Sequence, residues 1–287
     1  MRRNKRFTFW QWFLLCLLVG LGSPSLQITE ARTSQKVEEK IPGLPPGYTL
    51  IEGDIQVPVE FARSLRRQSP NAPQATLGAS FWPNGIVPFE FDNSACTPKT
   101  STCVEAANQT AMLNAMAEIE AIANVDFQNC PDNKCSGDYV HVQASTGNNS
   151  AIGKTGGQQV INIASWSDRF RIVHELLHCL GMYHEQSRRD RDNFVTINCG
   201  NIQGDSGDCQ SSLAKINFNR LDNVATYRDY DFDSVMHYDR CAFSKDCPAG
   251  LTCNCTNETI TVKASNNKIG QRDHMSTLDK LAMMGIY

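Results

Sequence analysis

The sequence lacks an excess of charge of either sign. Its 287 residues include 27 lysines and arginines against 30 aspartates and glutamates, which leaves a formal net charge of -3 at pH 7. Binding to nucleic acid or to an anionic membrane surface relies on concentrated positive charge, so we expect neither as a partner. No internal repeat is present, and the length suits one domain of about 200 residues with additional segments.

A second hydrophobic run is also missing. The single apolar stretch, Phe13 to Leu21, follows four basic residues among the first six. This is the layout of a secretory signal peptide, and the run is shorter than the roughly 20 residues that a membrane span prefers. We therefore predict a signal peptide over residues 1–25 and a secreted, extracellular product without a membrane anchor.

Cysteine, by contrast, is abundant, and twelve cysteines indicate an oxidising compartment. Most fall in local sets: Cys96 with Cys103, Cys130 with Cys135, Cys199 with Cys209, and then Cys241, Cys247, Cys253 and Cys255. Such spacing predicts short-range disulfides, with the pairing of the last four left open. Zinc binding by those four is the alternative, which an oxidising compartment disfavours. Cys179 is expected to remain an unpaired, buried thiol.

One stretch in the middle of the chain carries a metal-binding pattern. It begins with His-Glu-x-x-His, and on a helix this spacing places His174 and His178 on one face, one turn apart. Gly181 allows a sharp turn, which can return His184 toward the same metal. Three imidazoles leave a fourth position open for water, and Glu175 lies where it can act on that water. A buried helix whose histidines only form hydrogen bonds is the alternative, and three histidines at this spacing disfavour it.

This pattern resembles that of the metzincin zinc peptidases, and Glu185, directly after the third histidine, resembles the astacin family within them. The following residues through Asn193 match an astacin segment, and Ser234 to Tyr238 resembles the methionine turn. The resemblance covers roughly residues 75–287. It implies an α+β metzincin-type fold, with a mixed twisted sheet and the active-site helix in an upper subdomain. A loop-rich lower subdomain holds the methionine turn and a C-terminal helix. Astacins usually carry two disulfides, however, one joining the strand after the long helix to the far C-terminus and one flanking the edge strand, and no cysteine stands at those places.

The resemblance also implies a role for each residue at the site. The implied ligands of one Zn²⁺ per chain are His174, His178 and His184. Glu175 is the implied general base, Tyr238 stabilises the oxyanion, and Met236 forms an apolar floor beneath the histidines. The implied activity is hydrolysis of peptide bonds in protein or peptide substrates. A catalytically inactive zinc-fold binding protein and a non-astacin metzincin peptidase are the alternatives. Glu175 disfavours the first and Glu185 the second.

Residues 26–74 are polar and proline-rich and lack the periodicity of a packed domain, so we expect an extended propeptide. It contains Ile-Glu-Gly-Asp-Ile at residues 51–55, which resembles the Phe-x-Gly-Asp motif of astacin-type precursors, with Ile51 in place of the aromatic residue. By this resemblance Asp54 occupies the zinc in place of water and keeps a zymogen inactive. A Gly-Asp turn in a linker is the alternative.

Maturation is the second implication of this segment. Candidate sites for a trypsin-like activating protease are Arg63, Arg66 and Arg67. The start of the mature protein, expected to be a monomer, is left open between Arg67 and Gly78. The resemblance implies that the new terminus folds inward and meets Glu185, whereas pairing of Glu185 with a nearby arginine such as Arg188 is the alternative.

Periodicity predicts the regular elements of the catalytic region. They are a strand within 81–91, a helix over 102–123, strands at 139–142 and 160–163, and a helix over 276–287 opened by Ser276 and Asp279 as a capping pair. The strand at 160–163 resembles the edge strand that pairs with substrate in astacins. N-glycosylation sequons begin at Asn108, Asn148, Asn254 and Asn257. His237 is expected to face away from the metal, and His141 and His274 lie in no motif.

Overall fold

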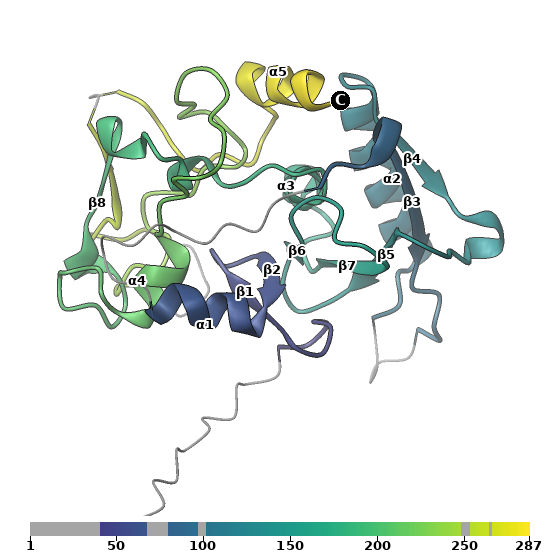
Figure 1. The fold of residues 1–287 in the computed structure, drawn as a ribbon, viewed down its shortest axis with the longest axis horizontal. Coiled ribbons are helices and arrows are strands. Elements are labelled where there is room, and N and C mark those ends of the chain that lie inside the picture. The colour runs from purple at the N-terminus through teal and green to yellow at the C-terminus, as the bar shows by residue number, and fades with distance from the viewer. Residues whose placement is uncertain (1–40, 68–79, 97–101, 248–252, 264–265) are drawn as a thin grey trace, which may run out of the picture. The chain divides into compact units, whose positions relative to one another are not determined.

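The computed structural model describes residues 41–67, 80–96, 102–247, 253–263 and 266–287 (Figure 1). The predicted signal peptide and most of the interval predicted to contain the mature start lie outside these ranges. Within them, no helix has both the length and the apolar character needed to cross a membrane.

A seven-stranded mixed sheet, ordered β1-β2-β6-β7-β5-β3-β4, is the largest element. Its strands are β1 (Tyr48–Ile51), β2 (Ile55–Pro58), β3 (Ile86–Phe91), β4 (Asp126–Asn129), β5 (Tyr139–Ala144), β6 (Asn149–Ser150) and β7 (Gln158–Ile163). Neighbours among β3, β4, β5 and β7 are parallel, and β6 runs antiparallel to β7. β7 is buried at every position after its first, as expected for a central strand covered on both faces. The strands predicted at 81–91, 139–142 and 160–163 are thereby confirmed.

Within the described residues, five α-helices accompany the sheet: α1 (Val59–Arg67), α2 (Ala106–Glu120), α3 (Arg169–Cys179), α4 (Ser212–Asn217) and α5 (Thr277–Ile286). α2 confirms the predicted helix within shorter bounds, because its buried side chains recur at helical spacing from Met112 to Ile119. α2 packs against α3, and both contribute to the core beneath the sheet. α5 opens with the predicted capping box between Ser276 and Asp279.

The second half of the chain has fewer regular elements. A two-stranded sheet pairs β8 (Val195–Ile197) with β9 (Ile260–Val262). Short 3₁₀ turns lie at Pro83–Gly85, Pro131–Asn133, Glu185–Ser187, Arg191–Asn193 and Cys199–Asn201. A separate apolar cluster, which includes Val195, Phe218, Tyr238 and Ile260, holds these loops together. The lower part of the predicted fold is therefore loop-rich, as expected.

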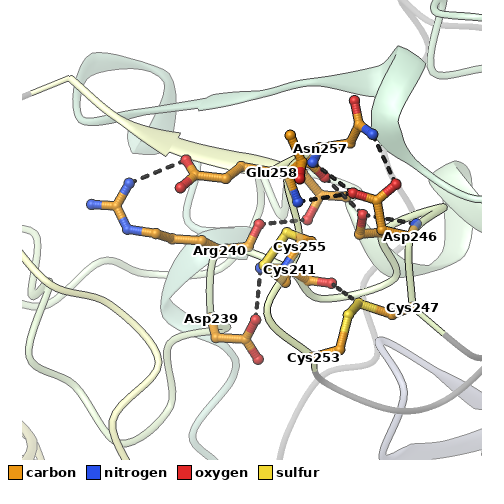
Figure 2. The surroundings of a disulfide bond; sticks show 12 residues. Asp239, Arg240, Cys241, Asp246, Cys247, Cys253, Cys255, Asn257 and Glu258 are labelled. Atoms are coloured by element: carbon orange, nitrogen blue, oxygen red, sulfur yellow. Dashed lines mark hydrogen bonds and ion pairs between the residues drawn. A yellow bond between two sulfur atoms is a disulfide. The ribbon is translucent and has the colours of Figure 1, made fainter.

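Local disulfides fasten several of the loops. The predicted pairs Cys96–Cys103, Cys130–Cys135 and Cys199–Cys209 are confirmed, and the open pairing resolves as Cys241–Cys255 and Cys247–Cys253. Figure 2 shows the last two beside Asp246, whose carboxylate accepts the backbone N–H groups of Thr256 and Asn257 at 2.9 and 2.8 Å. Among the cysteines that the structure describes, Cys179 is free and buried, and this burial raises the pKa of its thiol to about 12.

The expectation of an extended propeptide is wrong for residues 48–67. β1 and β2 form an antiparallel hairpin, and α1 follows and packs against α4 (Figure 1). The apolar side chains of this segment share a cluster with Ile152, Tyr183 and Ile216 of the catalytic region. Two four-residue strands and a nine-residue helix are too short for a clear periodic pattern, and their burial depends on partners distant in sequence.

The expectation that residues 160–163 form an edge strand is also wrong. β7 lies between β5 and β6, and the two-residue strand β6 is the outermost strand that the catalytic region contributes on this side. β2 of the hairpin pairs with it in parallel, Ile55 opposite Ser150. A strand of two polar residues has no hydrophobic alternation, so periodicity could not predict it.

Buried amide side chains link the hairpin region to the sheet. Gln56 Nε2 donates to Asn149 Oδ1 at 2.7 Å, and Asn162 Nδ2 donates to the same oxygen at 2.8 Å. Gln143 Nε2 donates to Asn162 Oδ1 at 2.7 Å, and the backbone oxygen of Gly43 accepts from Gln143 and Asn162 at 2.9 and 3.1 Å. These bonds satisfy polar groups that burial would otherwise leave unpaired.

Candidate metal centre and catalytic cleft

Helix α3 and the turn after it bring three imidazoles together. Asp168 caps the start of α3, where its Oδ1 accepts the N–H of Arg171 at 3.3 Å, and Gly181, with a φ of 108°, turns the chain just after the helix ends. The Nε2 atoms of His174 and His178 each lie 3.2 Å from Nε2 of His184. Two nitrogens bound to a tetrahedral zinc at about 2.0–2.1 Å lie about 3.3–3.4 Å apart, so this spacing fits the metal.

Asp54 completes the group. Its Oδ2 lies 3.2 Å from His174 Nε2, and its Oδ1 lies 3.3 and 3.6 Å from Nε2 of His184 and His178. The four side chains offer ligand atoms within 4.8 Å of one another, a set that can hold one metal ion. Burial alone would raise the pKa of Asp54, but the charge of His184 and the close contacts with the three histidines leave it well below its usual value. Three imidazoles and a carboxylate suit zinc.

The outer nitrogens of the histidines are fixed as well. Nδ1 of His174 donates to the backbone oxygen of Val235, and Nδ1 of His178 donates to that of Met182, both at 2.8 Å. Nδ1 of His184 donates instead to Oε2 of Glu52, also at 2.8 Å. Such bonds fix the tautomer and leave each Nε2 lone pair free for a metal.

Glu52 is a residue of this site that the sequence did not indicate. It occupies the unspecified position of the Gly-Asp motif, and its side chain is only 1% exposed. An acidic residue two positions before Asp54 was the one available signal. Acidic residues are usually solvated, so nothing in the sequence marked this one as buried against a histidine.

Tyr238 lies at the same site but is held by the hairpin. Its ring centroid is 4.7 Å from that of His184, and its hydroxyl donates to the backbone oxygen of Glu52. Burial raises the pKa of Tyr238 well above its usual value, which keeps the phenol protonated. Met236 is buried in the same core as the helix that carries the first two histidines.

Glu175 lies between the two helical histidines and is 2% exposed, and its Oε2 has no hydrogen-bond partner among the residues that the structure describes. Burial, with the nearby charge of Asp54, raises the pKa of Glu175 well above its usual value. The residue borders a cavity of about 550 Å³, which Asp54, Tyr238 and Arg272 also line. A buried carboxylate oxygen of this kind, beside such a cavity, is typical of a catalytic group.

Comparison with known proteins identifies the family of this chain. The family model described as Astacin, a peptidase family, matches residues 75–287. The chain belongs to the astacin family. The low choriolytic enzyme of Oryzias latipes is 31% identical over 244 residues, covering 83% of this chain and 78% of that relative. The zinc metalloproteinase nas-15 of Caenorhabditis elegans is 29% identical over 207 residues, 72% of this chain.

The chain spans about a third of the length of that nematode relative, since the match covers 32% of it. Among solved structures, high choriolytic enzyme 1, a hatching enzyme zinc-protease from the medaka fish Oryzias latipes, is 28% identical. Its TM-score is 0.57, and the match covers 74% of this chain and 96% of that one. The predicted α+β astacin-type fold is confirmed.

The remaining histidines of this astacin chain lie apart from the metal group. His237 is held between the hydroxyl of Tyr230 and the backbone oxygen of Tyr238, both at 2.7 Å, so it faces away as predicted. His141 contacts Glu90 at 2.9 Å, and His274 contacts Asp233 at 2.8 Å.

Glu185, the residue that first indicated an astacin, pairs here with Arg188. Its Oε1 accepts from Arg188 Nη1 at 3.0 Å and from the N–H of Asp231 at 2.8 Å. Burial nevertheless raises the pKa of Glu185 to about 8, although Arg188 opposes the shift. The side chain borders a cavity of about 140 Å³. The predicted contact with a new N-terminus stays a prediction, because most of the interval predicted to contain that terminus lies outside the described residues.

Proposed function

We propose that this chain is a secreted zinc-dependent endopeptidase made as an inactive precursor. One observation carries the proposal: three imidazole nitrogens and the Asp54 carboxylate converge on one point, next to the buried carboxylate of Glu175. Membership of the astacin family agrees with it, as does the medaka neighbour, whose name describes a zinc-protease. The predicted signal peptide and the five local disulfides support secretion.

Each catalytic residue has a defined task in this proposal. When bound by the three histidines, Zn²⁺ supplies a Lewis acid that polarises the scissile carbonyl and lowers the pKa of water to about 7. Glu175 takes a proton from the attacking water and passes it to the leaving amine. Tyr238 donates a hydrogen bond from its hydroxyl to the developing oxyanion of the substrate, for which it must first leave the backbone oxygen of Glu52.

The hairpin accounts for the inactivity of the precursor. Asp54 takes the position that water needs, the carbonyl of Glu52 occupies the Tyr238 hydroxyl, and β2 covers β6. A substrate strand needs an exposed sheet edge, which β2 denies it. Cleavage after Arg67 by a trypsin-like protease would release all three of these contacts together, since residues 68–78 contain no lysine or arginine.

A comparison of the activated wild type with Glu175→Ala tests the function. Both are expressed as precursors and cut with trypsin, and their zinc content and cleavage of casein are then measured. We expect wild type to cleave casein and Glu175→Ala to bind zinc without cleaving. Glu105→Ala, the same change at an exposed glutamate, is the control and should behave as wild type. A cut, zinc-loaded wild type without activity would instead support the inactive binding protein.

A further inference from the structure

We infer that the prosegment, the predicted propeptide of residues 26–74, also serves to load the metal. Glu52 is the positioning residue through which the prosegment tightens zinc binding. The inference rests on the precursor proposed above. Glu52 is not a metal ligand, and it acts through its contact with Nδ1 of His184.

The three histidines differ in the group that accepts a hydrogen bond from Nδ1. His174 and His178 donate from Nδ1 to backbone carbonyls of the catalytic region. His184 donates to a carboxylate that the prosegment supplies, with both side chains no more than 1% exposed. A carboxylate behind a ligating imidazole orients the ring and increases its basicity, and loss of such a partner typically weakens metal binding about 10–100-fold.

Charge balance favours the same role. A divalent ion held by three neutral imidazoles brings two positive charges into a buried site. The prosegment brings two carboxylates, Asp54 at the ligand position and Glu52 behind His184. Buried charges are stable only with such partners. Arg191 is a buried cation near Glu52, but its guanidinium donates to the backbone oxygens of Gln186 and Phe218.

The backbone of the turn holds both carboxylates in place. Glu52 has a φ of 49°, a left-handed conformation that few residues with a Cβ adopt. Its N–H donates to the backbone oxygen of Ile216 at 2.9 Å, and the N–H of Gly53 donates to Asn217 Oδ1 at 3.0 Å. Uncommon backbone conformations held by surrounding contacts are found at functional sites. Here the turn directs two acidic side chains to opposite sides of one imidazole.

Activation therefore removes a metal ligand and the partner of His184 in the same event. The precursor therefore binds zinc more tightly than the mature form does. The metal is acquired before cleavage, and the mature enzyme retains it.

Metal affinity of the uncut precursor tests the inference. The zinc dissociation constant is measured by competition with a chromophoric chelator for wild type, Glu52→Gln and Glu60→Gln. Glu52→Gln keeps the shape but loses the charge, and we expect binding about 10–100-fold weaker. Glu60, on the same segment with a side chain 77% exposed, is the matched control and should leave the constant unchanged. A folded Glu52→Gln precursor that binds zinc like wild type would overturn the proposal and leave Glu52 as a residue that only shapes the turn.

Two further measurements distinguish an effect of the contact between Glu52 and His184 from an effect on the fold. Mature protein cut from Glu52→Gln has the wild-type sequence, so both mature forms must bind zinc equally. Should Glu52→Gln fail to fold, proton NMR of the zinc-loaded wild type replaces it. We expect the Nδ1 proton of His184 to be shifted downfield and protected from solvent exchange in the precursor, and to lose both properties after cleavage. A rapidly exchanging proton in the precursor would overturn the contact. Failure of the proposed peptidase activity would not alter these outcomes, because they are read from metal binding alone.

Discussion

Replacing Asp54 by alanine should make the uncut precursor cleave peptides. The carboxylate is the part of the hairpin that reaches the metal group, with three imidazole nitrogens 3.2–3.6 Å away. The three imidazoles are 0–3% exposed and the Asp54 side chain is 21% exposed, and breaking such a largely buried charged contact by removing one partner costs about 3–5 kcal/mol. At about 1.4 kcal/mol per factor of ten, the ratio of docked to open hairpin should fall by about a hundredfold to several thousandfold.

Full activity is not expected, because buried apolar side chains of the hairpin and of α1 also hold this segment in place. Ile55 and Val57 are completely buried, and Leu65 is 3% exposed. Leu65→Ala weakens this packing without touching the metal group and costs about 2–5 kcal/mol. It should therefore also raise the activity of the uncut precursor, by about thirtyfold or more.

The assay uses a quenched peptide, with the chain length of each precursor verified by mass spectrometry before and after the reaction. Zinc content is matched, and Glu60→Ala on the same segment is the control. The reasoning fails if a folded, zinc-loaded Asp54→Ala precursor is as inactive as wild type. Latency would then depend on something other than this carboxylate.

Four shorter predictions concern the catalytic region. Glu175→Gln should retain zinc and lose at least about a hundredfold in turnover, measured on cut protein. Tyr238→Phe should also retain zinc and lose turnover with little change in KM, as a steady-state analysis would reveal. Cys179→Ala should keep zinc content and activity, since its thiol is buried and uncharged. Glu185 has a pKa of about 8 in the folded protein against an ordinary value of 4.5, so its contribution to stability falls as pH rises between these two values. Glu185→Gln should therefore stabilise the precursor against urea more at pH 8.5 than at pH 4.5.

The sequence was most informative where one residue type at a fixed spacing determines the chemistry. The roles of His174, His178 and Gly181 follow from helix geometry and glycine conformation. The three isolated cysteine pairs follow from their short separation in sequence, whereas the pairing of the last four cysteines did not. Asp54 could be placed only by resemblance, since nothing local brings residue 54 to a helix more than a hundred residues later. The structure brings these side chains together as that resemblance implied.

What could not be predicted depends on contacts between distant segments. The hairpin and α1 are stable because Ile55 and Leu65 bury against side chains such as Ile152, which supply no periodic pattern within the segment itself. Glu52 is buried because its carboxylate meets His184, 132 residues away. Local propensity describes neither contact, and the charge of Glu52 alone predicts exposure.

For the secreted chain proposed above, the local disulfides have a consequence for the order in which the cysteines oxidise. The first three pairs join cysteines 7, 5 and 10 residues apart, with no other cysteine between them, so each can close as soon as its second member emerges. The last two are nested, because Cys247–Cys253 lies inside the 14-residue span of Cys241–Cys255. Along the chain, Cys247 therefore follows Cys241 before the native partner Cys255 does. Thiol–disulfide exchange within this one loop, rather than across the molecule, is the step at which a disulfide isomerase would act.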